Sequence, residues 1–432
     1  MKKIYSLILL FSCIQTAVHA QWAAVNNGVD NYVWGSAVYN NELYVSGNFE
    51  NADGNQALGI AKWNGSAWSA VGGGFQTNAF SYVVRGLIVY NNELIAGGYV
   101  DSAGGMAIHK VARWNGSSWS AMGTNCPIST INCFAIHNGE LYAGGQAGGA
   151  VKVCVAKWNG SGWTGLDTET ADHNVWSLAS YNGELYAGGS YTSFNGLTTA
   201  HLVKYNGSSW SAVNTGFGMF DIIRAMAVFN GKLYIGGGFT SVGGVSASNI
   251  ASYDGSTWSA LQGGVNSTVQ SLLPYGTQLF VGGAYWSVNG VTANRAASWN
   301  GSAWTVLGTD LGAGAKTICV YNNELYYGGE GAFNGQNYVA RWNGGTFTGI
   351  EKAVTQNGYT IYPNPASARV TISGISKATD IEITDITGRP LRFLYTKPEE
   401  GTLQLDVAEW KKGMYLIRDL HSAGQVQKLI VE

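Results

Sequence analysis

"KWNGSAWSAV", residues 62–71, decides the fold because six near copies of it follow along the chain. The copies are RWNGSSWSAM (113–122), KWNGSGWTGL (157–166), KYNGSSWSAV (204–213), SYDGSTWSAL (252–261), SWNGSAWTVL (298–307) and RWNGGTFTGI (341–350). Asn-Gly between two strand-forming runs predicts a two-residue hairpin turn, in which both central residues have positive φ. Asn-Gly-Ser is also a glycan acceptor, but Asp254 replaces the Asn in one copy and Gly345 the Ser in another. We therefore interpret the motif as a structural turn, with glycosylation as the secondary alternative.

A second hairpin precedes each copy and ends, in six of seven cases, in Gly-Gly. These hairpins are VYNNELYVSG (38–47), VYNNELIAGG (89–98), IHNGELYAGG (136–145), SYNGELYAGG (180–189), VFNGKLYIGG (228–237), PYGTQLFVGG (274–283) and VYNNELYYGG (320–329). A unit is therefore four short strands. The second aromatics of the downstream turns are spaced 43 to 51 residues apart: Trp68, Trp119, Trp163, Trp210, Trp258, Trp304 and Phe347. Seven such units predict an all-β fold, a seven-bladed β-propeller over residues 21–350.

The repeated residues also predict how the blades pack. We expect Trp63 and Trp68 on one blade face, where they fill the wedge between neighbours. The Gly-Gly pair is expected to let the backbone of the next blade approach. Residues 22–25 (WAAV) read as an extra fourth strand that closes the ring, although residues 347–350 compete for that place.

The pattern resembles the kelch-type propeller repeat, as in LYAGG (185–189) followed by Tyr205 and Trp210. The resemblance covers residues 22–350 and implies the propeller fold. The aromatic pair is one residue closer than is usual in that family, and most of the polar residues that link kelch blades are missing.

The composition changes near residue 351. Residues 351–432 hold 10 of the 24 Lys and Arg, 10 of the 26 Asp and Glu and four of the six prolines. Alternating runs such as RVTISG (369–374) and DIEITDITGRPL (380–391) predict a small antiparallel Ig-like β-sandwich. We expect a linker at 351–358 and a second domain at 359–432.

This tail resembles the C-terminal sorting domain of the bacterial type IX (Por) secretion system. The resemblance rests on YPNPA (362–366), DITGR (385–389), KKGMYLIR (411–418) and KLIVE (428–432). It implies a protein that is secreted or attached to the outer cell surface, with the secretion machinery as the partner of residues 359–432. The motif residues are Tyr362, Pro363, Asn364, Pro365, Gly388, Gly413, Tyr415 and Lys428. An ordinary β-sandwich binding module is the alternative.

The composition and the N-terminus agree with export. Lys2 and Lys3, an apolar run and Val18-His19-Ala20 read as a signal peptide over residues 1–20. The chain is 12% charged with a net charge of −2, which argues against nucleic-acid binding, and no later run is long enough to span a bilayer. Cys126 and Cys133 form the candidate disulfide, whereas Cys154 and Cys319 fit small buried thiols equally well.

We find no catalytic motif, metal-ligand spacing or cofactor signature in the sequence. The densest polar cluster, DTETADH (167–173), is interpreted as a solvated loop. One position, five residues before the aromatic of each upstream hairpin, is aromatic, cationic or amide in all seven units. Its residues are Trp34, Arg85, Asn132, Trp176, Arg224, Gln270 and Lys316.

If the first strand of each unit is innermost, these seven residues ring one mouth of the central channel. The two long, divergent loops of each unit emerge on the same face, which favours function there. Indole faces for stacking on sugar rings, surrounded by donors, suggest a glycan site; the alternative is that the residues only plug the mouth. We expect a non-enzymatic recognition module for glycans or protein partners. A propeller lyase or hydrolase and a structural adhesion protein are the alternatives.

Overall fold

The computed structural model describes residues 22–77, 82–148, 152–167, 174–198, 201–308, 311–312, 314–333, 337–343, 360–362, 368–373, 381–385, 389, 391, 395–396, 402–419 and 426–431. The predicted signal peptide (1–20) and linker (351–358) lie outside these residues, as do Pro363, Asn364, Pro365 and Gly388. The chain divides into two compact units, Met1–Thr348 and Gly349–Glu432. In the ranges just given, no helix is long and apolar enough to cross a membrane.

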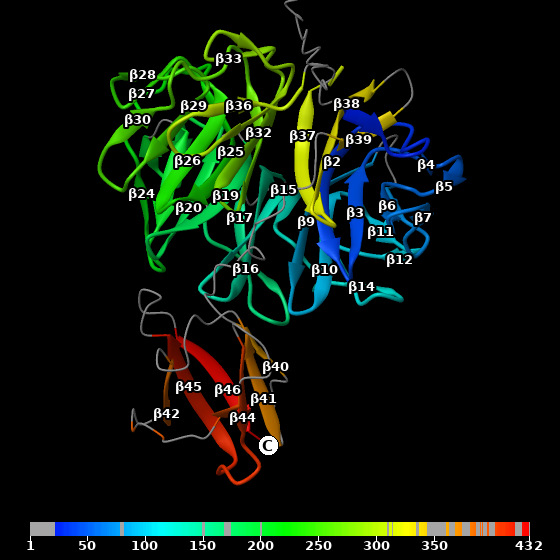
Figure 1. The fold of residues 1–432 in the computed structure, drawn as a ribbon, viewed down its shortest axis with the longest axis vertical. Coiled ribbons are helices and arrows are strands. Elements are labelled where there is room, and N and C mark those ends of the chain that lie inside the picture. Colours follow the sequence, from blue (N-terminus) through cyan, green and yellow to red (C-terminus); the bar gives the residue numbers. More distant parts are fainter. Residues whose placement is uncertain are drawn as a thin grey trace, which may run out of the picture. The chain divides into compact units, whose positions relative to one another are not determined.

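Four-stranded antiparallel sheets build the first unit, and each follows one sequence repeat (Figure 1). The first three are β2 (Val33–Tyr39), β3 (Glu42–Gly47), β6 (Ile60–Trp63) and β7 (Trp68–Ala70); β9 (Val83–Tyr90), β10 (Glu93–Tyr99), β13 (Val111–Trp114) and β14 (Trp119–Ala121); and β15 (Ile128–His137), β16 (Glu140–Ala147), β17 (Val155–Trp158) and β18 (Trp163–Gly165). The next two are β19 (Val175–Tyr181), β20 (Glu184–Gly189), β23 (Leu202–Tyr205) and β24 (Trp210–Ala212); and β25 (Ile222–Phe229), β26 (Lys232–Gly238), β29 (Ile250–Tyr253) and β30 (Trp258–Ala260).

The sixth sheet is β31 (Val269–Tyr275), β32 (Gln278–Gly283), β35 (Ala296–Trp299) and β36 (Trp304–Val306). The seventh takes β37 (Ala315–Tyr321), β38 (Glu324–Phe333) and β39 (Asn337–Trp342) from the end of the unit and β1 (Trp22–Ala24) from its start. β1 pairs with β39 in antiparallel register, with Trp22 opposite Trp342. The N-terminal strand therefore closes the ring, and the competing residues 347–350 lie outside the described residues.

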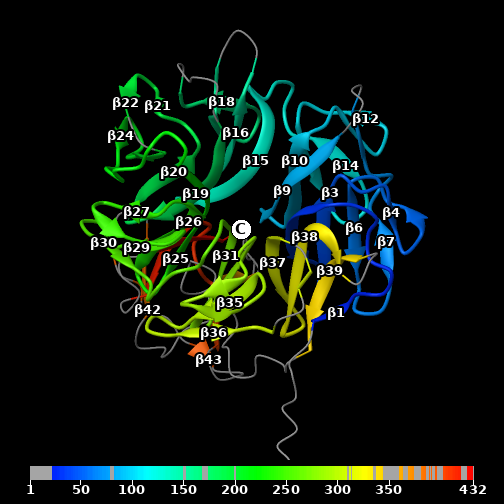
Figure 2. The ribbon, with the colours of Figure 1, turned by 90° about the horizontal axis from the view of Figure 1, so that it is seen from above.

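The first strand of each sheet is innermost. β2, β9, β15, β19, β25, β31 and β37 each contact the next in this order, and β37 contacts β2. Figure 2 shows the sheets following one another in sequence order around a common centre. The predicted all-β propeller is confirmed.

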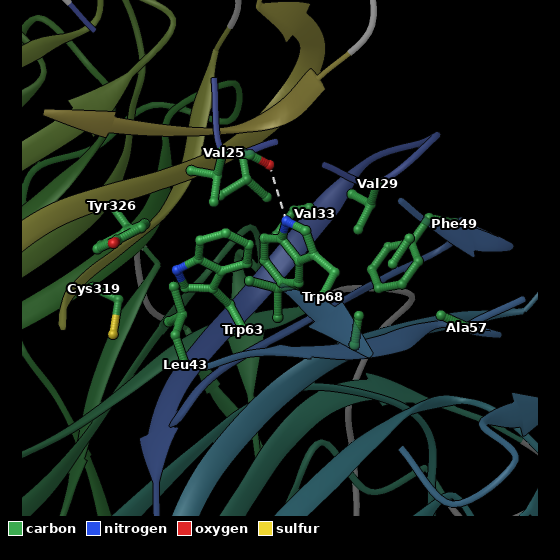
Figure 3. Packing of buried hydrophobic residues seen from close by; sticks show 14 of the residues in the cluster. Val25, Val29, Val33, Leu43, Phe49, Ala57, Trp63, Trp68, Cys319 and Tyr326 are labelled. Atoms are coloured by element: carbon green, nitrogen blue, oxygen red, sulfur yellow. Dashed lines mark hydrogen bonds between the residues drawn. The ribbon is translucent and has the colours of Figure 1, made fainter. Parts of the chain in front are cut away.

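The second tryptophan of each motif connects neighbouring sheets. Its indole Nε1–H donates to a backbone carbonyl just after the fourth strand of the preceding sheet, as from Trp68 to Val25 (3.0 Å; Figure 3). Trp22 takes this role in the seventh sheet, donating to Leu307 O at 2.6 Å. The corresponding bonds join Trp119 to Val71, Trp163 to Met122, Trp210 to Leu166, Trp258 to Asn214 and Trp304 to Leu261. Trp22 thus belongs to the tryptophan series in the structure, and Phe347, which the sequence aligned with it, lies outside the described residues.

The repeated turn differs from the predicted two-residue turn. Trp63 pairs directly with Trp68, so four residues intervene, and the rings lie 5.4 Å apart on one face, as expected. Asn64 Oδ1 accepts hydrogen bonds from the backbone N–H groups of Ser66 and Ala67 and from the Ser66 hydroxyl. Asp254 accepts the same set in the fifth sheet, which explains why Asp can replace Asn. The turn with two positive φ angles is instead in the upstream hairpin, as at Asn40 (49°) and Asn41 (59°).

The loops between second and third strands are less divergent than predicted. Five of them carry the same small hairpin: β4 (Asn51–Ala52) with β5 (Asn55–Gln56), β11 (Ser102–Ala103) with β12 (Met106–Ala107), β21 (Ser193–Phe194) with β22 (Leu197–Thr198), β27 (Ser241–Val242) with β28 (Val245–Ser246), and β33 (Ser287–Val288) with β34 (Val291–Thr292). β8 (Phe75–Gln76) adds a third strand to β11. These hairpins bury one side chain each, such as Phe194 or Val242, so packing explains their similarity.

Buried groups in this unit serve the fold. Cys126, Cys133, Cys154 and Cys319 are all free thiols, so the candidate Cys126–Cys133 disulfide is absent from this structure. The carboxylate of Asp167, from the polar cluster at 167–173, is buried and accepts the backbone N–H groups of Cys154 and Val155. The rest of that cluster, 168–173, lies outside the described residues.

The second unit contains two antiparallel sheets. One is β40 (Thr360–Tyr362), β41 (Arg369–Ser373), β44 (Thr402–Asp406) and β43 (Tyr395–Thr396); the other is β42 (Ile381–Asp385), β45 (Gly413–Asp419) and β46 (Val426–Val431). Residues of both sheets, including Ile372, Leu405, Ile383 and Ile417, share one buried core. This is the predicted β-sandwich.

Candidate functional site

The seven residues singled out in the sequence occupy the same structural position in every sheet. In every sheet the pairing of first and second strands skips the residue at this position, namely Trp34, Arg85, Asn132, Trp176, Arg224, Gln270 and Lys316; β15 skips Ser129 as well. A β-bulge of this kind redirects the side chain that it carries. We call these seven residues the axial cluster, because they lie on the innermost strands at the ends where the long loops begin.

The glycine pair makes the bulge possible. A Cβ on Gly237 would lie 1.8 Å from the carbonyl oxygen of Ile222, two residues before the bulge. The equivalent distances are 1.9 Å at Gly47 and Gly98 and 2.0 Å at Gly145 and Gly189. The predicted role of the glycines needs correction here: this close backbone belongs to the same sheet. The next sheet approaches the first glycine of the pair with side chains, as Val269 does at Gly236.

The cationic members of the cluster stack on its two indoles. The Arg85 guanidinium carbon and the Lys316 Nζ lie 5.1 and 4.8 Å from the centre of the Trp34 ring. Arg85 also lies 5.5 Å from the Trp176 ring, and Arg224 lies 4.8 Å from it. Arg85 comes from the second sheet and Trp176 from the fourth, so this contact reaches past the third sheet. The structure therefore brings these five side chains together around the axis of the ring.

Hydrogen bonds connect most of the cluster to its surroundings. Arg85 donates to Asn132 Oδ1 at 2.7 Å, and Asn132 donates to the Val175 carbonyl at 3.0 Å. Lys316 forms an ion pair with Glu330 at 2.6 Å. Arg224 stacks on the Trp176 indole and donates no hydrogen bond to any described residue.

The electrostatics of the cluster are those of crowded cations. Burial lowers the pKa of Arg85, and the positive charge of Arg224 lowers it further. Burial also lowers the pKa of Arg224, against which the Glu330 carboxylate acts. The pKa of Lys316 is lowered by burial and by both arginines, and raised by Glu330. Each cation is therefore in an environment that disfavours positive charge.

Solvent reaches the cluster, but its indole faces are already occupied. All seven side chains are partly exposed. The predicted stacking of a sugar ring on Trp34 or Trp176 does not fit this arrangement, because two cations lie over each indole. Three buried polar atoms of the cluster have no hydrogen-bond partner within the described residues: Arg85 Nε, Trp176 Nε1 and Gln270 Oε1.

Sequence reasoning missed two residues next to the cluster. Glu330 directly follows the glycine pair of the seventh sheet and binds Lys316. Asn48 has the equivalent position in the first sheet, where its Oδ1 accepts the Trp34 Nε1–H at 3.3 Å. The sequence feature that could have identified them is a polar residue directly after the glycine pair, on the strand that faces the bulge.

The described sorting-motif residues lie in strands of the second unit. Tyr362 ends β40, Gly413 begins β45, and Lys428 lies in β46 opposite Leu416. Tyr415 is buried against Trp410, and its hydroxyl donates to the Lys411 carbonyl at 2.7 Å. Its role in this structure is to fasten the KKGMY turn to the core.

Residues 360–432 match the family described as a secretion system C-terminal sorting domain. The C-terminal unit is a sorting domain. It marks the protein as one secreted or attached to the outer cell surface through type IX secretion, and it implies interaction with that machinery.

The whole chain has more distant likenesses. No curated protein matches it. Similar solved structures include "YCF48 bound to D1 peptide" (15% identity, TM-score 0.47, covering 74% of this chain and 94% of that one). An ancestral GH74 enzyme has 14% identity and a TM-score of 0.47 over 75% of this chain and 49% of its own. The computationally designed Ika8 protein has 10% identity and a TM-score of 0.44, over 73% and 97%.

Proposed function

We propose that the protein is an exported recognition module, a kelch-like seven-bladed propeller that binds an extracellular ligand at the axial cluster. The sorting domain delivers it, and the ligand is a glycan or, failing that, a protein. One observation carries the proposal: every sheet has a bulge with one polar or aromatic side chain at the same position of its innermost strand, and six of these seven side chains contact another member of the cluster. The frame around these positions is nearly copied from unit to unit, whereas these residues differ in kind.

A binding role is favoured over catalysis by the acidic groups available. Glycoside hydrolysis generally needs a pair of carboxylates, one of them free to act as an acid. Within the described ranges, Glu330 is the carboxylate that contacts the cluster, and it is ion-paired with Lys316. The described part of the chain also holds no group of three or more His, Cys, Asp or Glu side chains that could bind a metal ion. The lyase or hydrolase alternative would require chemistry from other residues.

A glycan array tests the proposal. The protein from residue 21 onward is applied to the array beside Trp176→Ala and Arg224→Ala variants, with melting curves to confirm folding. We expect selective binding by the wild type that both variants weaken. Binding that survives in both folded variants would remove the cluster as the site. A blank array would reject the glycan and leave a protein partner or a structural coat role.

A further inference from the structure

The axial cluster carries more positive than negative charge. It gathers Arg85, Arg224 and Lys316, and Glu330 is the carboxylate that acts on them. Among the described residues, these three cations and one carboxylate leave two positive charges in excess. The indoles partly offset the electrostatic repulsion between these cations, because a cation over an aromatic face is attracted to the ring. They do not neutralise the positive charge.

Arg224 differs from the other two cations because it donates no hydrogen bond to a described residue. Arg85 is engaged with Asn132, and Lys316 with Glu330. Arg224 donates to no described residue, although its guanidinium has five N–H donors in a planar fork. The guanidinium carbon lies 4.8 Å from the centre of the Trp176 ring, and the N–H groups have no hydrogen-bond partner among the described residues. A guanidinium fork matches the two oxygens of a carboxylate or sulfate.

Exposed aromatic side chains lie in the loops that lead into the cluster, whereas the indoles of Trp34 and Trp176 are covered by cations. Phe220 is 90% exposed and lies four residues before Arg224, just ahead of β25. Tyr32 is 37% exposed and lies just ahead of β2, with its ring 6.3 Å from Trp34. Both lie in loops that lead into the innermost strands, and the Tyr32 ring lies beside Trp34 of the cluster.

We propose that the axial cluster binds the anionic group of an acidic saccharide, a carboxylate or a sulfate, with Arg224 as its direct partner. Lys316 and Arg85 add attraction at longer range, and the exposed aromatic side chains of the loops contact the sugar. This inference rests on the proposed function and narrows its ligand class. A neutral sugar would leave the excess charge uncompensated and the fork of Arg224 empty.

Paired probes that differ only in charge test this. Oligogalacturonate is compared with its methyl ester, and sulfated with desulfated keratan oligosaccharide, whose sugars carry no carboxylate, by calorimetric titration into the protein from residue 21 onward. We expect binding of at least one acidic member, at least tenfold weaker binding of its neutral counterpart, and an affinity that falls as NaCl is raised. The Arg224→Gln variant should lose at least tenfold in affinity. The control Arg113→Gln removes the same charge at an exposed site paired with Glu93 and should behave like wild type.

The outcomes separate this inference from the proposed function. Equal binding of acidic and neutral members, or equal loss in both glutamine variants, overturns the anion site while leaving saccharide recognition in place. If no saccharide binds, the melting temperature in sulfate against chloride, at equal ionic strength, decides instead. A sulfate-dependent rise that Arg224→Gln reduces and Arg113→Gln does not supports the anion site without the saccharide. An equal rise in all three proteins overturns it.

Discussion

Replacing Trp22 by phenylalanine tests whether the N-terminal strand closes the ring. Trp22 is 7% exposed, and its Nε1–H donates to Leu307 O at 2.6 Å, between residues 285 positions apart in the chain. Phenylalanine keeps an aromatic ring beside Tyr327 and Trp342 but cannot donate this bond. The substitution therefore removes the hydrogen bond between the seventh and sixth sheets and keeps most of the aromatic packing.

The expected loss follows from the buried carbonyl that is left unpaired. An unsatisfied buried acceptor costs about 1–3 kcal/mol. The smaller ring gives up contact area worth about 1 kcal/mol more, at about 0.8 kcal/mol for each buried methylene equivalent. We expect about 2–4 kcal/mol in total, which corresponds to a melting temperature lower by about 4–8 °C at about 2 °C per kcal/mol.

Calorimetric melting of Trp22→Phe beside Trp119→Phe provides the comparison. Trp119 makes the same bond to Val71 at 3.2 Å within a seam that is continuous in sequence. If β1 seals the ring, both variants should lose comparable stability. A Trp22→Phe protein that melts like wild type, while Trp119→Phe melts lower, would refute closure by β1.

Three further predictions concern a glycine, a buried carboxyl group and a turn. Gly237→Ala should destabilise by about 3 kcal/mol or more, because its Cβ would lie 1.8 Å from the Ile222 carbonyl oxygen, whereas Gly238→Ala meets nothing closer than 3.3 Å and should be tolerated in the same urea titration. Burial raises the pKa of Asp167 from 3.8 to about 6. Between about pH 4 and pH 6 the carboxyl group therefore keeps its proton in the folded state and has lost it in the unfolded chain. The free energy of unfolding should therefore fall by up to about 3 kcal/mol as pH rises from about 4 to about 6. Asp167→Asn should lack this fall, so the difference in free energy of unfolding between wild type and variant should change across this pH range. A constant difference would contradict the raised pKa. In the fourth repeated turn, Asn206→Asp should keep the melting temperature and Asn206→Ala should lower it, since Asn206 Oδ1 accepts the N–H groups of Ser208 and Ser209; equal melting of both variants would rule out the side-chain cap.

The repeat made most of the propeller predictable from sequence, because the same spacing of apolar residues and turns must be satisfied seven times. The type of turn could not be predicted from sequence, because Asn-Gly occurs both in a type I′ hairpin and in the longer turn capped by Asn64. Ring closure could not be decided either. The pattern WAAV at 22–25 shows an extra strand, but not which strand edge it joins.

The position of the candidate site could be read from the sequence, but its chemistry could not. One polar position in a near-copied frame identified the seven cluster residues, and the bulge that presents them follows from the glycine pair. The occupation of Trp34 and Trp176 by cations depends on contacts between sheets, which no pattern within a unit reveals. Glu330 escaped notice because the position after the glycine pair is polar in only some units.

The most direct test of the axial cluster as a binding site is calorimetric titration of the strongest array ligand into wild type, Trp176→Ala and Trp286→Ala. Trp286 is 59% exposed and directly precedes the loop hairpin of β33 and β34. The Trp286→Ala variant therefore removes an indole that is not part of the cluster. We predict at least a tenfold loss of affinity for Trp176→Ala and wild-type affinity for Trp286→Ala. Wild-type affinity in a folded Trp176→Ala protein would contradict the account.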